Sequence, residues 1–188
     1  MQRRHFLAAL APVAAAPFVA RSELARALLS PNAAMNPETD TAIAAGATQP
    51  IVKLDRKDAE WKPLLTDMQY AVLFEEHTER SGTSPLNREK REGTFVCAAC
   101  HLPLFASETK FESGTGWPSF WAPHEGHVAT KRDFRLILPR TEYHCARCGG
   151  HQGHVFNDGP KPTGKRYCNN GVALAFVPKD EPLPALRG

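Results

Sequence analysis

The 188-residue sequence lacks any run of about 20 apolar residues, the length that a membrane-spanning helix needs, so we expect no stable membrane span. It also has little net charge: the formal value is +3, and the cations are scattered along the chain. Proteins that bind nucleic acid concentrate positive charge, so we expect no nucleic-acid partner. The composition, with 42% hydrophobic and 23% charged residues, is that of an ordinary globular protein.

Residues 1–29 differ from the rest and have the order of an export signal. Arg3 and Arg4 form a basic start, and an Ala-rich apolar run follows as far as Ala20. The Arg-Arg-x-Phe-Leu arrangement resembles a twin-arginine signal, which the twin-arginine export machinery reads. A Sec signal or an N-terminal helix is the alternative. We therefore expect an exported protein, periplasmic if the source is a Gram-negative bacterium.

The remaining chain divides into a linker and one domain. Residues 30–50 are rich in Ala, Pro, Thr and Asn and show no apolar period, which is typical of a flexible linker. Residues 51–188 hold all five cysteines and all three tryptophans. A domain of this size buries enough surface to fold without disulfides.

The domain begins with a helical pattern. Apolar residues in 55–80 recur at intervals of three and four, which predicts helix. Pro63 splits this region into two short helices, and the second begins near Thr66 or Asp67.

After Arg80 the sequence changes to short apolar runs separated by Gly, Pro and Asn. Their length and their turn signals predict strands. The runs are GTFVCAAC (93–100), LPLFAS (102–107), DFRLILPR (133–140), GHVFNDG (153–159) and RYCNNGVALAFV (166–177). We therefore predict a mostly β fold of antiparallel sheets with short N-terminal helices.

Four of the five cysteines form two CxxC pairs, Cys97 with Cys100 and Cys145 with Cys148. Each CxxC turn brings two sulfurs together, and two turns supply the four thiolates that suit tetrahedral Zn²⁺. Disulfides are the alternative, since an exported protein meets an oxidising compartment. A disulfide within a CxxC pair closes a very small loop, however, and stabilises little. We predict one structural zinc ion that staples the domain and has no open position for catalysis.

The fifth cysteine, Cys168, stands alone in the segment KRYCNNG. The commonest role of a free cysteine is that of a small buried apolar residue. On a strand, however, Arg166 and Asn170 would share a face with Cys168 and form a row of cation, nucleophile and neutral donor. A nearby guanidinium favours the thiolate, which is the reactive form.

Two further segments carry candidate site residues. GGHQGHVFNDGP contains His151, His154 and Asp158. We interpret the histidines as proton donors because the four cysteines already account for a metal; core or surface histidines are the alternative. The glycine-rich turn SGTGW is followed by PSFW and places Trp117 where an aromatic residue alone would indicate only core packing.

Together, these segments resemble the B-type methionine sulfoxide reductases, which reduce methionine-R-sulfoxide. The resemblance runs from about Asp55 to Val177. It rests on SGTGWPSF (113–120), CARCGGHQGHVFNDGP (145–160), PTGKRYCNNG (162–171) and the CAAC turn at 97–100.

The resemblance implies that Cys168 is the nucleophile and that Trp117 holds the ε-methyl group of the substrate. It also implies zinc ligation by Cys97, Cys100, Cys145 and Cys148, and a polar shell of His151, His154, Asp158, Arg166 and Asn170. The implied partners are oxidised proteins that carry methionine-R-sulfoxide.

The sequence departs from the family pattern at two places. Many members have a cysteine at the position of Thr115, where it resolves the sulfenic acid formed on the nucleophile. Here no cysteine is spare, so we expect an external thiol, from a thioredoxin-like reductant, to reduce Cys168. Asn169 and Gly171 stand where the family often has an aliphatic residue and Ser, and we expect Asn169 to face away from the active row.

Two other functions compete with the reductase. A non-enzymatic zinc module would give Cys168 no role. A thiol peroxidase or disulfide oxidoreductase would place its reactive cysteine at a helix N-terminus or within CxxC, whereas Cys168 lies in a predicted strand.

Overall fold

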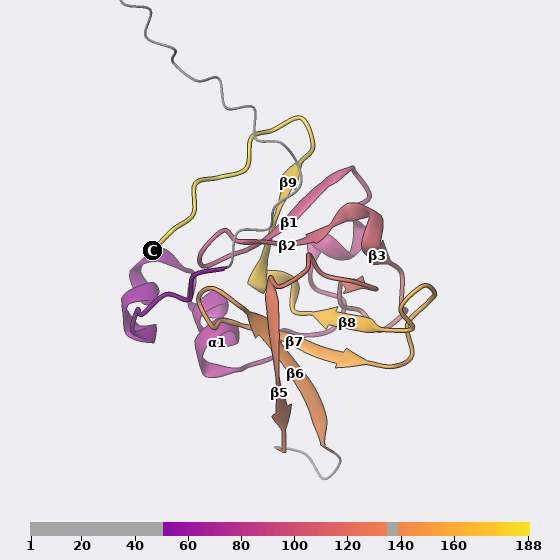
Figure 1. Ribbon diagram of the computed structural model, residues 1–188, viewed down its shortest axis with the longest axis horizontal. Coiled ribbons are helices and arrows are strands. Elements are labelled where there is room, and N and C mark those ends of the chain that lie inside the picture. The colour runs from indigo at the N-terminus through magenta and orange to yellow at the C-terminus, as the bar shows by residue number, and fades with distance from the viewer. Residues whose placement is uncertain (1–50, 135–138) are drawn as a thin grey trace, which may run out of the picture. The chain divides into compact units, whose positions relative to one another are not determined.

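The computed structural model describes residues 51–134 and 139–188, which form two antiparallel β-sheets with short helices (Figure 1). The export signal and linker predicted for 1–29 and 30–50 lie outside the described residues. Within the described part of the chain, no helix has the length and apolar character needed to cross a membrane.

The described chain opens with the two short helices that the sequence predicts. A 3₁₀ helix, η1 (Asp58–Leu64), contains Pro63, and the α-helix α1 (Asp67–Glu75) follows it. Thr66 caps α1: its Oγ1 accepts a hydrogen bond from Gln69 N at 3.2 Å, and Gln69 Oε1 accepts one from Thr66 N at 3.0 Å. This capping box fixes the predicted start of the second helix. Three further 3₁₀ turns are η2 (Pro85–Arg88), η3 (Ser107–Thr109) and η4 (Gly171–Ala173).

The smaller sheet has three strands in the order β2-β1-β9. They are β1 (Gly93–Cys97), β2 (Pro103–Ala106) and β9 (Leu174–Pro178). Both pairings are antiparallel.

The larger sheet has six strands in the order β3-β4-β8-β7-β6-β5, again with antiparallel pairing throughout. Its strands are β3 (Lys110–Phe111), β4 (Ser119–Phe120), β5 (Val128–Asp133), β6 (Arg140–Cys145), β7 (His151–Phe156) and β8 (Arg166–Asn169). The predicted fold class is therefore confirmed.

Aromatic side chains from both sheets meet in the core. Phe95 and Phe105 come from the smaller sheet, and Phe120 and Tyr143 from the larger one; all four are fully buried. The Phe105 and Phe120 rings stack with centroids 4.2 Å apart, and Phe95 meets Phe120 edge-on at 4.9 Å. Such pairs add to the burial that holds the sheets together.

Two of the predicted strands are wrong in extent. RYCNNGVALAFV is not one strand: β8 ends at Asn169, η4 turns the chain, and β9 joins the other sheet. The turn is fixed by Glu79, whose carboxylate accepts the backbone N–H groups of Gly171 and Val172. DFRLILPR contains the end of β5 and the start of β6, and residues 135–138 lie outside the described residues.

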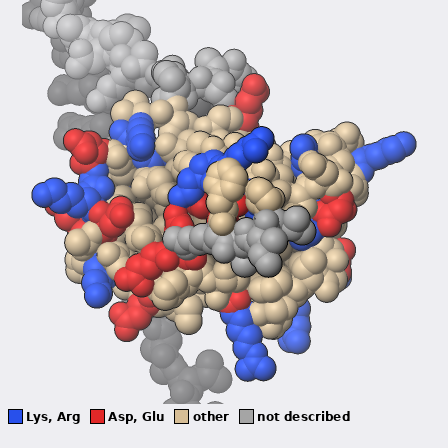
Figure 2. Space-filling view, turned by 90° about the horizontal axis from the view of Figure 1, so that it is seen from below, with Lys and Arg blue, Asp and Glu red and all other residues tan. Residues whose placement is uncertain are grey.

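The two ends of the described chain meet at the CxxC turns. Leu54 N donates to Arg147 O at 2.8 Å, and Arg187 N donates to Cys100 O at 3.1 Å. Arg187 Nη1 also donates to Leu64 O, at the end of η1, at 3.5 Å, and the C-terminus lies at the indigo start of the described chain in Figure 1. On the face seen in Figure 2, basic and acidic side chains are interspersed, as expected from the low net charge.

Candidate functional site

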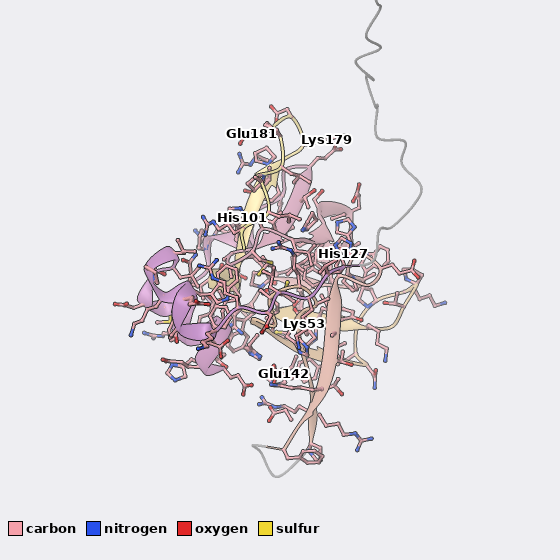
Figure 3. All side chains as sticks on the ribbon, turned by 60° about the vertical axis from the view of Figure 1, so that its left-hand side comes forward. Lys53, His101, His127, Glu142, Lys179 and Glu181 are labelled. Atoms are coloured by element: carbon pink, nitrogen blue, oxygen red, sulfur yellow. The ribbon has the colours of Figure 1, made fainter. Side chains whose placement is uncertain are left out.

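The two CxxC pairs form the same backbone turn. Cys97 O accepts a hydrogen bond from His101 N and Cys145 O accepts one from Gly149 N, both at 2.9 Å. The donor residue has a left-handed φ in each turn, 63° at His101 and 76° at Gly149. Glycine adopts this conformation without strain, whereas His101 (Figure 3) needs support, and its Nδ1 lies 2.9 Å from Ala185 O.

The turns bring four sulfurs into one buried cluster that could hold a metal ion. The ligand atoms of Cys97, Cys100, Cys145 and Cys148 lie within 4.8 Å of one another. The Cys97–Cys148 and Cys100–Cys145 sulfurs are 3.7 and 3.5 Å apart. A disulfide needs about 2.05 Å, whereas ligands bonded at about 2.3 Å to one tetrahedral ion lie about 3.8 Å apart. The cluster fits a closed four-sulfur metal site, as predicted.

Cys168 lies in β8, between two strands that supply its neighbours. It is paired with His154 of β7 on one side and with Ser119 of β4 on the other. Directly opposed residues project from the same face of an antiparallel sheet. Cys168 and His154 open on a small pocket of about 120 Å³, whose lining also includes Thr78, Trp117, Arg140, Phe156 and Asn170.

Hydroxyl groups form the nearest polar contacts of the Cys168 sulfur. Thr115 Oγ1 lies 3.8 Å from it, and Ser113 Oγ links Thr115 to Ser119 at 2.9 and 2.7 Å. Burial raises the pKa of the Cys168 thiol, although Thr115, Arg166 and Ser119 each lower it. The sequence argument for a thiolate was right about the direction of the Arg166 effect. The net direction is nevertheless upward, because desolvation of the buried thiol outweighs that effect.

His154 is oriented by a buried carboxylate. Its Nε2 lies 2.9 Å from Asp133 Oδ2, which also accepts a hydrogen bond from Arg140 Nη2 at 2.7 Å. Because a carboxylate accepts, Nε2 carries the hydrogen of the neutral ring and Nδ1 keeps its lone pair. Burial lowers the pKa of His154, with Asp133 opposing that shift, so the ring is neutral at pH 7.

His151 occupies the same face of β7 but lies deeper. Its Nδ1 is 3.0 Å from Oε1 of Glu142, a β6 residue that is labelled in Figure 3. Glu142 Oε2 also lies 3.3 Å from Lys131 Nζ. Its ring contacts His154 with centroids 5.5 Å apart. Its Nε2 is buried and has no hydrogen-bond partner within the described part of the chain.

Trp117 is held by the loop that follows α1. Its Nε1 donates to Glu79 O at 3.2 Å, which fixes the plane of the indole beside the pocket. Asn170 is tied to the same loop: its Oδ1 accepts from Glu79 N at 3.0 Å and its Nδ2 donates to Gln152 O at 3.1 Å. Asn170 also lines the pocket that Cys168 lines, so its role as a donor beside Cys168 stays a prediction. Its amide is used by backbone groups because the chain turns after Asn169.

Arg166 and Asp158 form a pair at the start of β8. Arg166 Nε and Nη2 donate to the two carboxylate oxygens of Asp158 at 2.9 and 2.8 Å. The guanidinium also lies 4.3 Å from the centre of the Phe156 ring. The pair holds Arg166 close enough to lower the pKa of Cys168, while Asp158 itself is largely exposed.

Sequence reasoning found Cys168, His154 and Trp117, which line one pocket, but it missed the groups that orient them. Asp133 and Glu142 are buried carboxylates on β5 and β6, and neither belongs to one of the motifs that mark the site in the sequence. Only the strand register brings them to the histidines.

Comparison with known proteins agrees with this geometry. The SelR domain family matches residues 65–178. A peptide methionine sulfoxide reductase MsrB from Leptospira interrogans is 49% identical over 125 residues, which is 66% of this chain and 95% of that protein. The MsrB proteins of Agrobacterium fabrum and Pseudomonas putida are 50% and 51% identical, over 67% and 68% of this chain and 94% and 97% of their own lengths. The chain therefore belongs to the MsrB family of peptide methionine sulfoxide reductases.

Proposed function

We propose that this protein reduces methionine-R-sulfoxide in oxidised proteins, with Cys168 as the nucleophile. The observation that carries the proposal is the register of β7 and β8, in which His154 stands opposite Cys168 at a pocket that Trp117 also lines.

The Cys168 sulfur attacks the sulfoxide sulfur and forms a transient S–S bond, and the oxygen then passes from the substrate sulfur to Cys168 as that bond breaks. The S–O bond of the substrate breaks, and methionine is released with its sulfur reduced by two electrons. Cys168 is oxidised by the same two electrons and becomes a sulfenic acid.

His154 moves the proton that this step requires. Cys168 is a thiol at rest because burial raises its pKa, so a base must remove its proton. The neutral His154 ring offers Nδ1 for that purpose, while Asp133 holds Nε2 and stabilises the imidazolium that forms. The imidazolium then delivers the proton to the sulfoxide oxygen, which makes the sulfoxide sulfur more electrophilic. General acid–base transfer of this kind contributes about 10²–10⁴-fold.

Trp117 selects the orientation of the substrate. The indole face receives the apolar ε-methyl group. Since the indole N–H already donates to Glu79 O, it has no hydrogen to give to the sulfoxide oxygen. The oxygen is therefore stabilised only on the histidine side of the pocket, which favours one epimer.

An external thiol returns Cys168 to its starting state. Thr115 stands beside the sulfur, and the other four cysteines belong to the buried cluster. A first reductant thiol condenses with the sulfenic acid and releases water. A second thiol then breaks the mixed disulfide, and a thioredoxin-like protein supplies both.

Cys97, Cys100, Cys145 and Cys148 would hold a zinc ion. With four thiolate ligands the ion would have no open position, so it would stabilise the fold and take no part in the reaction. The cluster also joins β1 to β6, two strands from different sheets.

We place the enzyme outside the cytoplasm, in the periplasm if the source is a Gram-negative bacterium. The twin-arginine pattern at Arg3 and Arg4 supports export of a folded, metal-loaded domain. Its substrates would then be exported proteins oxidised in the same compartment.

Separate R and S epimers of a peptidyl methionine sulfoxide test the activity. Incubated with the purified domain and dithiothreitol, the R epimer should disappear and the S epimer should persist. Cys168→Ser should be inert while it keeps its zinc. Loss of both epimers, or activity in Cys168→Ser, would contradict the proposal.

A further inference from the structure

Three fully buried polar side chains form a continuous hydrogen-bonded chain inside the domain. Tyr143, Gln152 and Asn169 each have 0% exposure. Tyr143 Oη donates to Asn169 Oδ1 at 2.6 Å, Asn169 Nδ2 donates to Gln152 Oε1 at 3.3 Å, and Gln152 Nε2 donates to Cys97 Sγ at 3.5 Å. The chain therefore ends on a sulfur of the metal cluster.

All three hydrogen bonds point in the same direction. An amide nitrogen can only donate, so the Cys97 sulfur acts as the acceptor at the end of the chain. Burying such groups is unfavourable unless each finds a partner, and here each one does. Hydrogen bonds to a metal ligand orient it and strengthen metal binding.

The other end of the chain reaches the strand of the nucleophile. Asn169 directly follows Cys168, and its backbone N–H donates to Pro118 O at 2.9 Å, next to Trp117. Its side chain also donates to Asn170 O at 2.7 Å. Displacement of Asn169 would therefore move the nucleophile and the indole that receives the substrate.

The packing of β7 against β8 leaves little room for such a displacement. A Cβ placed on Gly153 would lie 1.9 Å from Cys168 O, so the backbones of the two strands are in close contact at this point. Gln152, next to Gly153, is thus joined to β8 by its side chain while the adjacent backbone touches Cys168.

We propose that Gln152 and Asn169 are positioning residues that couple the four-cysteine site to Cys168. With zinc bound, Cys97 is fixed, and the Gln152–Asn169 contact holds β8 in the position that presents Cys168 to the pocket. Loss of the metal frees Cys97 and relaxes that contact. The inference takes Cys168 as the nucleophile of the proposed function, but its test needs only the zinc ion and the thiol.

Gln152→Met tests the metal side of the coupling, because it keeps the volume and removes the amide. Zinc release from the loaded protein to a chromophoric chelator should become about 10–100-fold faster, the usual effect of losing a partner of a metal ligand. Asn169→Leu should also accelerate release, although Asn169 touches no ligand. Asn157→Ala, which removes an exposed amide from the neighbouring turn, is the control and should leave release unchanged.

Alkylation of Cys168 by iodoacetamide tests the coupling at the nucleophile. In the unchanged protein, removal of zinc should alter the alkylation rate of Cys168. In loaded Gln152→Met the rate should already be shifted toward the zinc-free value. Tyr143→Phe removes only the terminal hydroxyl and should give smaller shifts of the same sign. It provides the test if Gln152→Met and Asn169→Leu do not fold.

Unchanged zinc release in Gln152→Met and Asn169→Leu would overturn the proposal, and so would fast release with an unaffected Cys168 rate. Neither measurement uses a sulfoxide. Failure of this coupling is therefore distinguishable from failure of the reductase activity.

Discussion

Cysteine sulfur occupies two contrasting environments in this protein, the four-sulfur cluster and the pocket of Cys168. In the cluster, each sulfur lies close to three other sulfurs, and three of the four cysteines are buried. In the pocket, a single sulfur faces hydroxyl groups, an imidazole and an open cavity. The contrast shows that its surroundings determine whether a cysteine has a structural or a reactive role. Four mutually close thiolates bind a metal, whereas an isolated thiol beside a base reacts.

The largest effect should come from opening the cluster. Cys145→Ser removes one of four ligands from a site whose binding free energy, about 10–16 kcal/mol for structural zinc, is folding free energy. We expect loss of stoichiometric zinc and a Tm lowered far beyond the effect of Cys168→Ser. Metal analysis and calorimetry measure both quantities. If Cys145→Ser kept its zinc and its Tm, the cluster would not be the structural site.

In the pocket, the base should matter next most. His154→Gln keeps a polar side chain but removes proton transfer, so kcat/KM should fall about 10²–10⁴-fold. Zinc content should remain unchanged, which separates this pocket from the cluster. Asp133→Asn should give a smaller loss of kcat/KM and shift the pH profile of kcat/KM, because it changes the hydrogen-bond partner of the imidazole and leaves the ring in place. Equal activity of His154→Gln and the unchanged enzyme would assign the proton transfer to another group.

A second thiol placed beside Cys168 should react with its sulfenic acid and give the pocket a pair of sulfurs. Thr115 Oγ1 lies 3.8 Å from Cys168 Sγ, so Thr115→Cys brings a second thiol within reach of the sulfenic acid. After one turnover without reductant, we expect an internal disulfide between residues 115 and 168. Peptide mapping under non-reducing conditions detects it. Persistence of a sulfenic acid in this variant would mean that the two side chains cannot meet.

The smallest effect is a pH dependence of stability outside the cluster. Burial lowers the pKa of His124 and His154 from 6.5 in the folded protein. Below pH 6.5 the unfolded chain takes up protons that the folded chain resists, so the free energy of unfolding falls as the pH drops. Tm measured between pH 7 and 5 should decrease, and less steeply in His154→Gln. A Tm that rises over this interval would contradict the sign.

The sequence predicts what depends on local pattern. The two helices follow from apolar spacing and the Thr66 cap, and the four-sulfur cluster follows from the CxxC turns. Cys168, His154 and Trp117 follow from motifs. In each case the signal lies within a few residues of the feature.

What the sequence does not predict depends on contacts between distant strands. Asp133 and Glu142 reach the histidines only through the register of β5, β6 and β7. The strand over 166–177 divides because Glu79, about 90 residues earlier in the chain, accepts hydrogen bonds at the turn. The pKa direction of Cys168 depends on burial in the assembled pocket, which outweighs the nearby cation.

The most direct test of the account is the chemical state of Cys168 after one turnover. Zinc-loaded protein is mixed with excess R epimer and no thiol, and the Cys168 peptide is analysed by mass spectrometry. We predict one methionine released per chain and a gain of one oxygen atom on Cys168, with the four cluster cysteines unmodified. Methionine released while Cys168 stays unoxidised would show that the oxygen is transferred elsewhere, and Cys168 would not be the nucleophile.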